Sequence, residues 1–232
     1  MLRICLILAF CSSAAAAEES WQAPLDEKEK LIDARIRQTH NIQGLYPSLV
    51  EIPADGAAGD ITTTNPFADV VHAVCWTANH LAGLSFKTEV LARCGAPPAT
   101  VAAARTRADE VFEAVYRCQR MTGRRGLQAR GYFLGHGEVY DEHTQHSGKL
   151  PFWHQGEVDG QSYRWVGDPS HHNYSDSIHG LIQYYTLAAQ GEQKERARDA
   201  IDALVSYWVD NDLKIDKFDR SRPAVPILGL TD

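Results

Sequence analysis

Two helices and the turn between them are encoded by residues 66–121, which read PFADVVHAVCWTANHLAGLSFKTEVLARCGAPPATVAAARTRADEVFEAVYRCQRM. Helical spacing of apolar residues begins at Pro66 and continues to about Cys94, where a glycine and a pair of prolines interrupt it. The same spacing resumes at Pro98 and continues to Met121. Because the connection is very short, this stretch predicts an antiparallel helical hairpin.

The rest of the chain repeats this organisation around a different central segment. Helical spacing recurs over residues 174–190 and 192–212, which predicts a second hairpin, and residues 26–40 predict one further helix. Residues 124–172 are rich in glycine and histidine, and we expect a long loop there, of a length that usually carries function. No strand-rich segment is expected, so the predicted fold class is all-α.

Composition excludes several classes of protein. The chain has 232 residues, of which 44% are hydrophobic and 23% charged, as in ordinary globular proteins. Its net charge of −7 argues against a nucleic-acid binder, which needs a basic surface for phosphate contacts. No segment reaches the roughly 20 apolar residues of a membrane-spanning helix, so no membrane span is expected.

The first residues have the pattern of a secretory signal peptide. A positive start at Arg3 is followed by the apolar run Ile4–Phe10 and by small residues up to Ala17. We expect residues 1–17 to be removed after about Ala17, which leaves residues 18–232 as a single helical-hairpin domain. The expected location is therefore secreted or periplasmic. A lipoprotein anchor at Cys11 is the alternative, but Phe10 is bulkier than the small residue that such processing normally needs before the cysteine.

Export determines how the remaining cysteines are interpreted. Cys75, Cys94 and Cys118 lie beyond the signal peptide. Cys75 and Cys118 are equally distant along the chain from the turn of the first hairpin, so both lie at the same height on packed helices. Oxidation is favoured outside the cytoplasm, and we predict a Cys75–Cys118 disulfide, with three buried thiols as the alternative.

Each hairpin contains one helix with an unusual polar stripe. On a helical wheel, six residues of the first long helix lie within roughly 100° of one another. They are Asp69, His72, Trp76, Asn79, His80 and Gly83. In the later helix the corresponding stripe is His172, Asp176, His179 and Gln183. Lys, Arg and Glu are concentrated instead on the second helix of each hairpin. The stripes are either ordinary solvated faces or the walls of a ligand-binding cleft, and this contrast favours the cleft.

The segment leading into the later helix reads YRWVGDPS, residues 163–170. One interpretation is that Asp168 or Ser170 is a turn or cap residue. The alternative is that Asp168 is a general acid beside an aromatic ring. Large aromatic residues serve as core residues or as platforms for sugar rings, and the candidate platforms are Trp76, Tyr132, Trp153 and Trp165.

Histidines are concentrated between residues 136 and 179. The spacing of His172, Asp176 and His179 is the nearest approach to a metal-ligand set. No zinc-protease pattern accompanies it, and ordinary hydrogen-bonded histidines are favoured. We expect no metal and no cofactor.

These motifs together resemble the six-hairpin (α/α) toroid proteins. The likeness rests on WVGDPS at residues 165–170, on YSD at 174–176 and on the charged helix that follows. ARGY at residues 129–132 and Asn79-His80 fit the same pattern. The resemblance implies secreted glycoside hydrolases or polysaccharide lyases with a catalytic carboxylate, or a Tyr or His base, in a cleft at one end of a helical ring. The chain holds fewer helices than a closed ring, which implies a partial toroid and either a truncated product or association of copies into a homo-oligomer.

We therefore expect a carbohydrate-active enzyme acting on an oligo- or polysaccharide. A hydrolase needs two carboxylates, for which Asp168 and Asp176 are the pair, with Asp69 in reserve. A lyase on uronate glycans would use His172 or Tyr174 as base and Arg130 to neutralise the acid, and a non-catalytic sugar-binding fragment is the third alternative. The expected substrate-binding residues are Trp76, Asn79, His80, Arg130, Tyr132, Trp165 and His179, and the expected catalytic residues are Asp168, Asp176 and His172.

Overall fold

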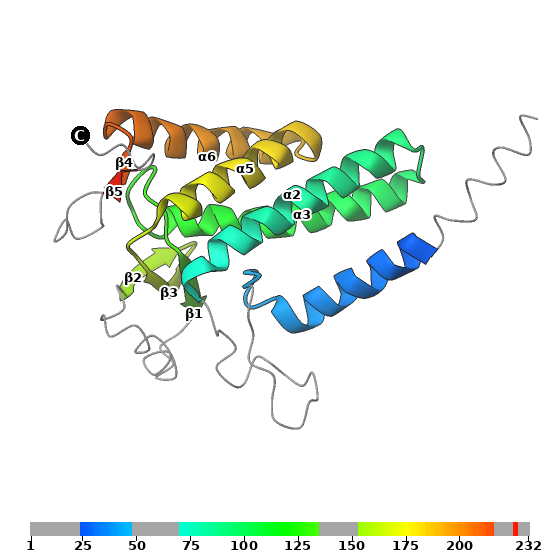
Figure 1. Ribbon diagram of the computed structural model, residues 1–232, viewed down its shortest axis with the longest axis horizontal. Coiled ribbons are helices and arrows are strands. Elements are labelled where there is room, and N and C mark those ends of the chain that lie inside the picture. Colours follow the sequence, from blue (N-terminus) through cyan, green and yellow to red (C-terminus); the bar gives the residue numbers. More distant parts are fainter. Residues whose placement is uncertain (1–23, 48–69, 135–152, 216–224, 227–232) are drawn as a thin grey trace, which may run out of the picture. The chain divides into compact units, whose positions relative to one another are not determined.

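The computed structural model describes residues 24–47, 70–134, 153–215 and 225–226 (Figure 1). The chain forms two compact units, Met1–Thr39 and His40–Asp232. The first contains almost all of the helix of residues 24–40, which confirms the helix predicted at 26–40. The expected signal peptide, the reserve carboxylate Asp69 and residues 135–152 of the glycine- and histidine-rich segment lie outside the described residues.

The first predicted hairpin is confirmed. A short 3-10 helix, η1 (Val70–His72), leads into α2 (Ala73–Arg93), and a tight turn connects α2 to α3 (Pro98–Arg120) (Figure 1). Proline suits the first position of a helix, because its missing N–H group has no intrahelical partner there. Leu81 of α2 and Phe112 of α3 are fully buried, so the hairpin closes around an apolar core.

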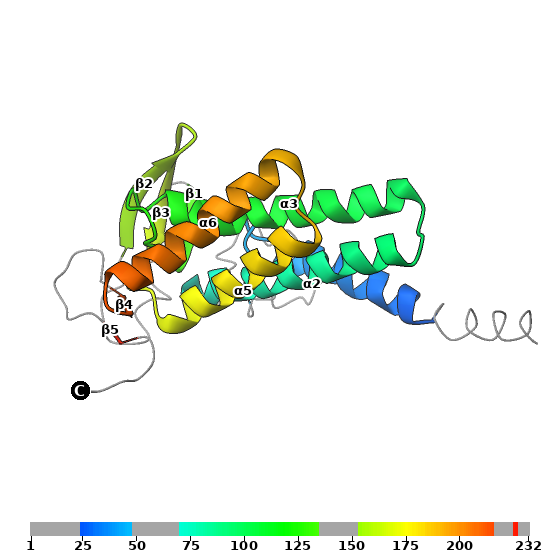
Figure 2. The same cartoon turned by 90° about the horizontal axis from the view of Figure 1, so that it is seen from above.

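The second predicted hairpin is also confirmed, as α5 (His171–Leu187) and α6 (Gly191–Asp210). Figure 2 shows α5 lying along α2. Their backbones are in close contact at Gly180, where an added Cβ would be 2.3 Å from the carbonyl oxygen of Ala78. Helix α5 therefore packs on α2 at a distance that only glycine permits.

The expected all-α partial toroid is wrong, because part of the central segment forms a sheet. Strands β1 (Gly131–Leu134), β2 (Trp153–Val158) and β3 (Gln161–Val166) pair antiparallel in the order β1-β3-β2. A second, minimal antiparallel pair joins β4 (Lys214–Ile215) to β5 (Val225–Pro226). The described part of the protein is thus mainly helical, with a small sheet beside the start of α2 (Figure 1).

Local sequence explains the β2–β3 hairpin. Asp159 and Gly160 connect the strands, and both have positive φ, 53° and 75°, as a two-residue hairpin turn requires. In β3, Tyr163 and Trp165 are buried while Ser162 is exposed, which is the two-residue alternation of a sheet with one face on the core. An Asp-Gly turn between alternating strands replaces the long loop that the glycine content suggested.

Within residues 24–47, 70–134 and 153–215, no helix combines the length and the hydrophobicity needed to cross a membrane.

Candidate functional site

The first turn of α5 is attached to the start of α2 by one buried amide. Asn173 Nδ2 donates to Cys75 Sγ at 3.2 Å and to the Val71 carbonyl oxygen at 3.4 Å. Asn173 Oδ1 accepts hydrogen bonds from the backbone N–H of Ser170 at 2.8 Å and from its hydroxyl at 2.9 Å, which caps the helix. A single side chain therefore fixes where α5 begins relative to α2.

Arg130 connects three further segments at the same place. Its Nε donates to the Val71 carbonyl oxygen at 2.8 Å, and its Nη1 donates to the Asp168 carbonyl oxygen at 3.3 Å. Its backbone N–H donates to the Val166 carbonyl oxygen at 2.8 Å, and its own carbonyl oxygen accepts from the backbone N–H of Val74 at 3.0 Å. Arg130 thus holds together the start of α2, the end of β3 and the loop before α5, a structural role in addition to the expected contact with substrate.

Asp168 lies on that loop in a conformation unusual for a residue with a side chain. Its φ is 56°, in the left-handed region, which asparagine and aspartate tolerate better than most residues. Arg130 holds its carbonyl oxygen, and the capping interaction between Ser170 and Asn173 follows directly. Left-handed residues fixed by their surroundings are found frequently at functional sites.

Asp176 lies one turn beyond Asn173 and interacts with a buried thiol. Burial raises the pKa of Cys75 to about 12, and the charge of Asp176 and a hydrogen bond between the two side chains add to the increase. At neutral pH the thiol therefore remains protonated and can donate to the carboxylate. Asp176 itself is half-buried, so its side chain is held on one side and exposed on the other.

The two polar stripes form one surface. Asn173 of α5 contacts Cys75 of α2, and further along both helices Gly180 of α5 contacts Ala78 of α2. Because the contacts advance in the same order on both helices, α2 and α5 run side by side in the same direction. Trp76 and Asn79 are exposed on α2, and His172 and His179 are exposed on α5, with Asp176 between the helices. On these helical wheels the exposed stripes point to the same side. We call this surface, Trp76, Asn79, His172, Asp176 and His179, the α2–α5 face.

Three expected binding residues have other surroundings. Tyr132 is fully buried, and its hydroxyl accepts from Arg117 Nη1 at 2.8 Å and donates to the Gln43 carbonyl oxygen at 2.9 Å. Trp165 is 1% exposed in β3, so it is a core residue and not an open platform. His80 is half-buried, with its ring 4.5 Å from the Tyr46 ring centroid.

Asn173 was not recognised from the sequence as part of the site. Its signal was the Ser170-x-x-Asn173 spacing, a variant of the capping box directly after Asp168. The partnership of Cys75 with Asp176 had no sequence signal, because it depends on how α5 packs on α2.

The described histidines and carboxylates do not gather as metal ligands do. Among the described residues, no group of three or more His, Cys, Asp or Glu side chains is arranged to hold a metal ion. His172 instead lies with its ring centroid 3.8 Å from that of His171.

The predicted Cys75–Cys118 bridge is not formed, and both residues are buried free thiols. Burial raises the pKa of Cys118, Arg117 opposes this increase, and Cys75 adds to it, so the two thiols are close enough to interact. Cys75 Sγ instead accepts a hydrogen bond from Asn173 and interacts with Asp176, both on α5.

Thiol labelling of the native protein is expected to modify Cys94 quickly and Cys75 and Cys118 only after unfolding. Cys94 is exposed, whereas burial and raised pKa values leave the other two without access or thiolate character. Peptide mass spectrometry after iodoacetamide treatment, with and without denaturant, measures this directly. Recovery of a Cys75–Cys118 cross-linked peptide from unreduced protein would contradict the expectation.

No protein-family model matches this chain, and neither a characterised protein nor a solved structure does.

Proposed function

We propose that this protein is an exported glycoside hydrolase that binds an oligo- or polysaccharide along the α2–α5 face. The observation that carries the proposal is Trp76, which is 48% exposed on a face whose other side chains are imidazole, amide and carboxylate. An exposed indole offers a flat apolar surface to a sugar ring, and the neighbouring polar groups can bind its hydroxyls.

The contrast with α6 supports a binding role for this face. The exposed surface of α6 carries charged side chains in ion pairs, such as Asp199 and Asp202 with Arg125, at 3.0 and 2.7 Å. The α2–α5 face has no lysine or arginine among its five residues. A surface of short polar groups and an aromatic ring is typical of ligand sites, whereas long charged side chains are typical of solvated helix faces.

Asp176 is the proposed general acid, and Asp168 is the proposed second carboxylate. Hydrolysis of a glycosidic bond generally needs two carboxyl groups on opposite sides of the bond. Asp176 is half-buried on the face, and the loop bearing Asp168 is fixed to the same helix terminus by Arg130 and Asn173. General acid–base catalysis requires its carboxyl groups to be held in place, and the backbone is fixed at both Asp168 and Asp176.

The contacts of Arg130 favour hydrolysis over elimination. A lyase acting on uronates needs a cation directed at the substrate carboxylate to stabilise the developing negative charge. Arg130 uses Nε and Nη1 on the carbonyl oxygens of Val71 and Asp168, which directs that edge of the guanidinium toward the backbone.

A product assay on a panel of polysaccharides tests the proposal. Xylan, dextran, polygalacturonate and alginate are incubated with the protein, and reducing ends and ultraviolet absorbance are both measured. New reducing ends without an absorbing double bond are expected. An absorbing unsaturated product would establish a lyase instead, and binding without any product would establish a non-catalytic sugar-binding protein.

Replacing Trp76 with alanine is expected to weaken binding of the best substrate at least about tenfold, which corresponds to about 1.4 kcal/mol. The expected cause is loss of the ring surface against which the sugar stacks. Isothermal titration calorimetry measures the affinity, and Trp76→Phe should retain most of it.

Val209→Ala is the matched control, because Val209 is an exposed apolar residue on α6, 64% exposed. Equal affinities for Trp76→Ala and Val209→Ala would place the glycan elsewhere.

A further inference from the structure

An exposed strip continues from the α2–α5 face along most of α2. Its large apolar residues are Trp76, Phe86 and Val90, which are 48%, 49% and 57% exposed. Asn79 and Gly83 lie between them and are exposed as well. Spacings of three and four positions place all five residues within roughly 80° of one another on a helical wheel. We call these five residues the α2 strip.

The α2 strip lacks the charged residues of an ordinary solvated helix face. Charged side chains do occur near the end of α2, where Arg93 pairs with Glu89 at 2.6 Å, but they lie outside the strip. A continuous row of exposed apolar side chains is typical of an interaction surface, whereas solvated faces carry charged and polar groups. The strip therefore presents its apolar groups to a ligand.

Two aromatic residues enclose an open section of the strip. Trp76 and Phe86 are ten positions apart in α2, which corresponds to about 15 Å along a helix that rises about 1.5 Å per residue. Between them, an added Cβ at Gly83 would meet nothing within 4 Å. The Asn79 amide is held against its own helix, because its Nδ2 donates to the Cys75 carbonyl oxygen at 3.1 Å.

The size and the neighbours of the strip favour a glycan over a protein partner. A standard protein interface engages roughly 20–30 residues on each side around a continuous apolar core. The strip is far narrower, and on the side of α5 it borders the polar side chains of Asp176 and His179. Sugar rings stack on single aromatic side chains, and their hydroxyls bind neighbouring polar groups.

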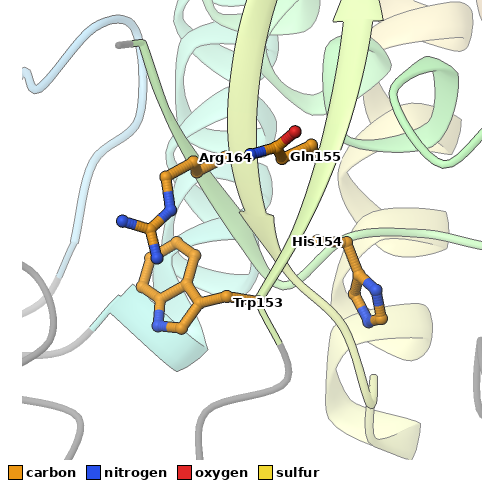
Figure 3. Close-up of a pocket in the computed structure, with 4 residues that line it drawn as sticks. All are labelled: Trp153, His154, Gln155 and Arg164. Atoms are coloured by element: carbon orange, nitrogen blue, oxygen red, sulfur yellow. The ribbon is translucent and has the colours of Figure 1, made fainter. Parts of the chain in front are cut away.

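A small hollow on the sheet illustrates why a chain of sugars needs an open surface. It has a volume of about 170 Å³ and is lined by Trp153, His154, Gln155 and Arg164 (Figure 3). Arg164 lies over the indole of Trp153, with its Cζ atom 5.3 Å from the ring centroid, so these side chains pack on each other. Pockets for drug-sized ligands typically reach roughly 300–1,000 Å³. The hollow is therefore too small for several linked rings, which the α2 strip can accept along its length.

We propose that Phe86 is a second platform for the glycan that stacks on Trp76, so that the substrate is an extended polysaccharide chain. Roughly four consecutive pyranose rings are needed to cover about 15 Å with one ring on each platform. The open section at Gly83 leaves room for the rings between the platforms. This inference rests on the proposed function and narrows its substrate class from oligo- and polysaccharides in general to long linear chains.

Oligosaccharides of increasing length test the second platform. Di-, tetra- and hexasaccharides are prepared from the four polysaccharides of the panel. Their binding is measured by calorimetry in the Asp176→Asn background, which limits cleavage. In at least one series, we expect the tetra- and hexasaccharide to bind about tenfold more tightly than the disaccharide, because only the longer chains reach both rings.

Phe86→Ala should abolish this gain in affinity with length and leave binding of the disaccharide unchanged. Phe86→Tyr retains an aromatic ring and should retain the gain. Val205→Ala is the matched control, because Val205 is an exposed apolar residue of α6, 41% exposed, and its replacement should change neither affinity. Circular dichroism checks the fold of each variant.

Gly83→Gln tests the open section between the two rings. The new side chain begins in open space, so the variant should retain its fold. It would then stand in the path of the glycan, and the hexasaccharide should bind about tenfold more weakly while the disaccharide binds as before.

Several results overturn the inference and leave the proposed hydrolase intact. They are equal affinities for all lengths with cleavage of short glycans, a gain with length that survives Phe86→Ala, and unchanged hexasaccharide binding in Gly83→Gln. A dimer in sedimentation experiments that Phe86→Ala dissociates would identify the strip as a contact between two copies, and it also overturns the inference. Absence of binding to any glycan removes both the inference and the proposed function.

Discussion

Replacing Gly180 with alanine should lower the midpoint of thermal unfolding by roughly 10 °C. The added Cβ would lie 2.3 Å from the carbonyl oxygen of Ala78 and 2.9 Å from its carbonyl carbon, and backbone atoms cannot move aside as a flexible side chain does. Helices α2 and α5 must separate to admit the methyl group. We expect the free energy of unfolding to fall by about 3 kcal/mol, the upper end of the range for overpacked cores. In a domain of this size, each kcal/mol lowers the unfolding midpoint by about 2–4 °C.

Gly83→Ala is the matched control for that experiment. Gly83 also lies in a helix, α2, but an added Cβ there would meet nothing within 4 Å. Alanine is favoured over glycine inside a helix by about 0.5–1 kcal/mol, so this variant should be slightly more stable than the wild type. If differential scanning calorimetry gives both variants the same midpoint, the close packing of α5 on α2 is wrong.

Replacing Asp176 with asparagine should reduce turnover of the best substrate by at least about 100-fold, the lower limit for loss of a general acid. The amide retains the shape and the acceptor oxygen that faces the Cys75 thiol, but it cannot deliver an acidic proton. The unfolding midpoint should therefore change little. Reducing-end assays and calorimetry on the same preparations separate the two effects.

Asp199→Asn controls for removal of a carboxylate at another site. Asp199 is an exposed residue of α6 that pairs with Arg125, and its replacement should leave turnover unchanged. Full activity in Asp176→Asn would exclude Asp176 as the acid. A loss of activity that follows the loss of folded protein would make it a structural residue.

The helices could be predicted because their signals are local. Apolar spacing, a proline at the start of α3 and glycines near the helix ends act within a few residues, and both hairpins follow from them. The packing of α5 on α2 has no such local signal. It depends on Gly180 meeting Ala78 more than 100 positions earlier in the chain, and on the hydrogen bond between Asn173 and Cys75.

The sheet could not be predicted as easily, although part of its signal was present. Asp159-Gly160 between alternating residues is a strong hairpin signal, but the surrounding glycines and histidines favoured a loop. Pairing of β1 with β3 joins residues about 30 positions apart, which no local pattern specifies. Alternation in β3 directs Trp165 into the core and Arg164 outward. Without the strands this direction cannot be predicted, and an indole is then equally compatible with an open platform.

The grouping of the candidate site residues follows in part from the sequence. Arg130, Asp168 and Asp176 were selected from motifs and helical spacing, and they lie around the same terminus of α5 through Asn173 and Cys75. What the sequence could not provide is the division of roles among them. The structural bonds of Arg130 and the left-handed backbone of Asp168 result from three-dimensional contacts between four separate segments.

Glycan binding on the α2–α5 face is tested most directly by a crystal structure of Asp176→Asn bound to an oligosaccharide that the wild type cleaves. We expect a sugar ring stacked on Trp76, with the glycosidic oxygen within hydrogen-bond distance of the side chain at position 176 and the glycan continuing between His172 and His179. An oligosaccharide bound on another surface, with no contact to Trp76 or to position 176, would contradict it.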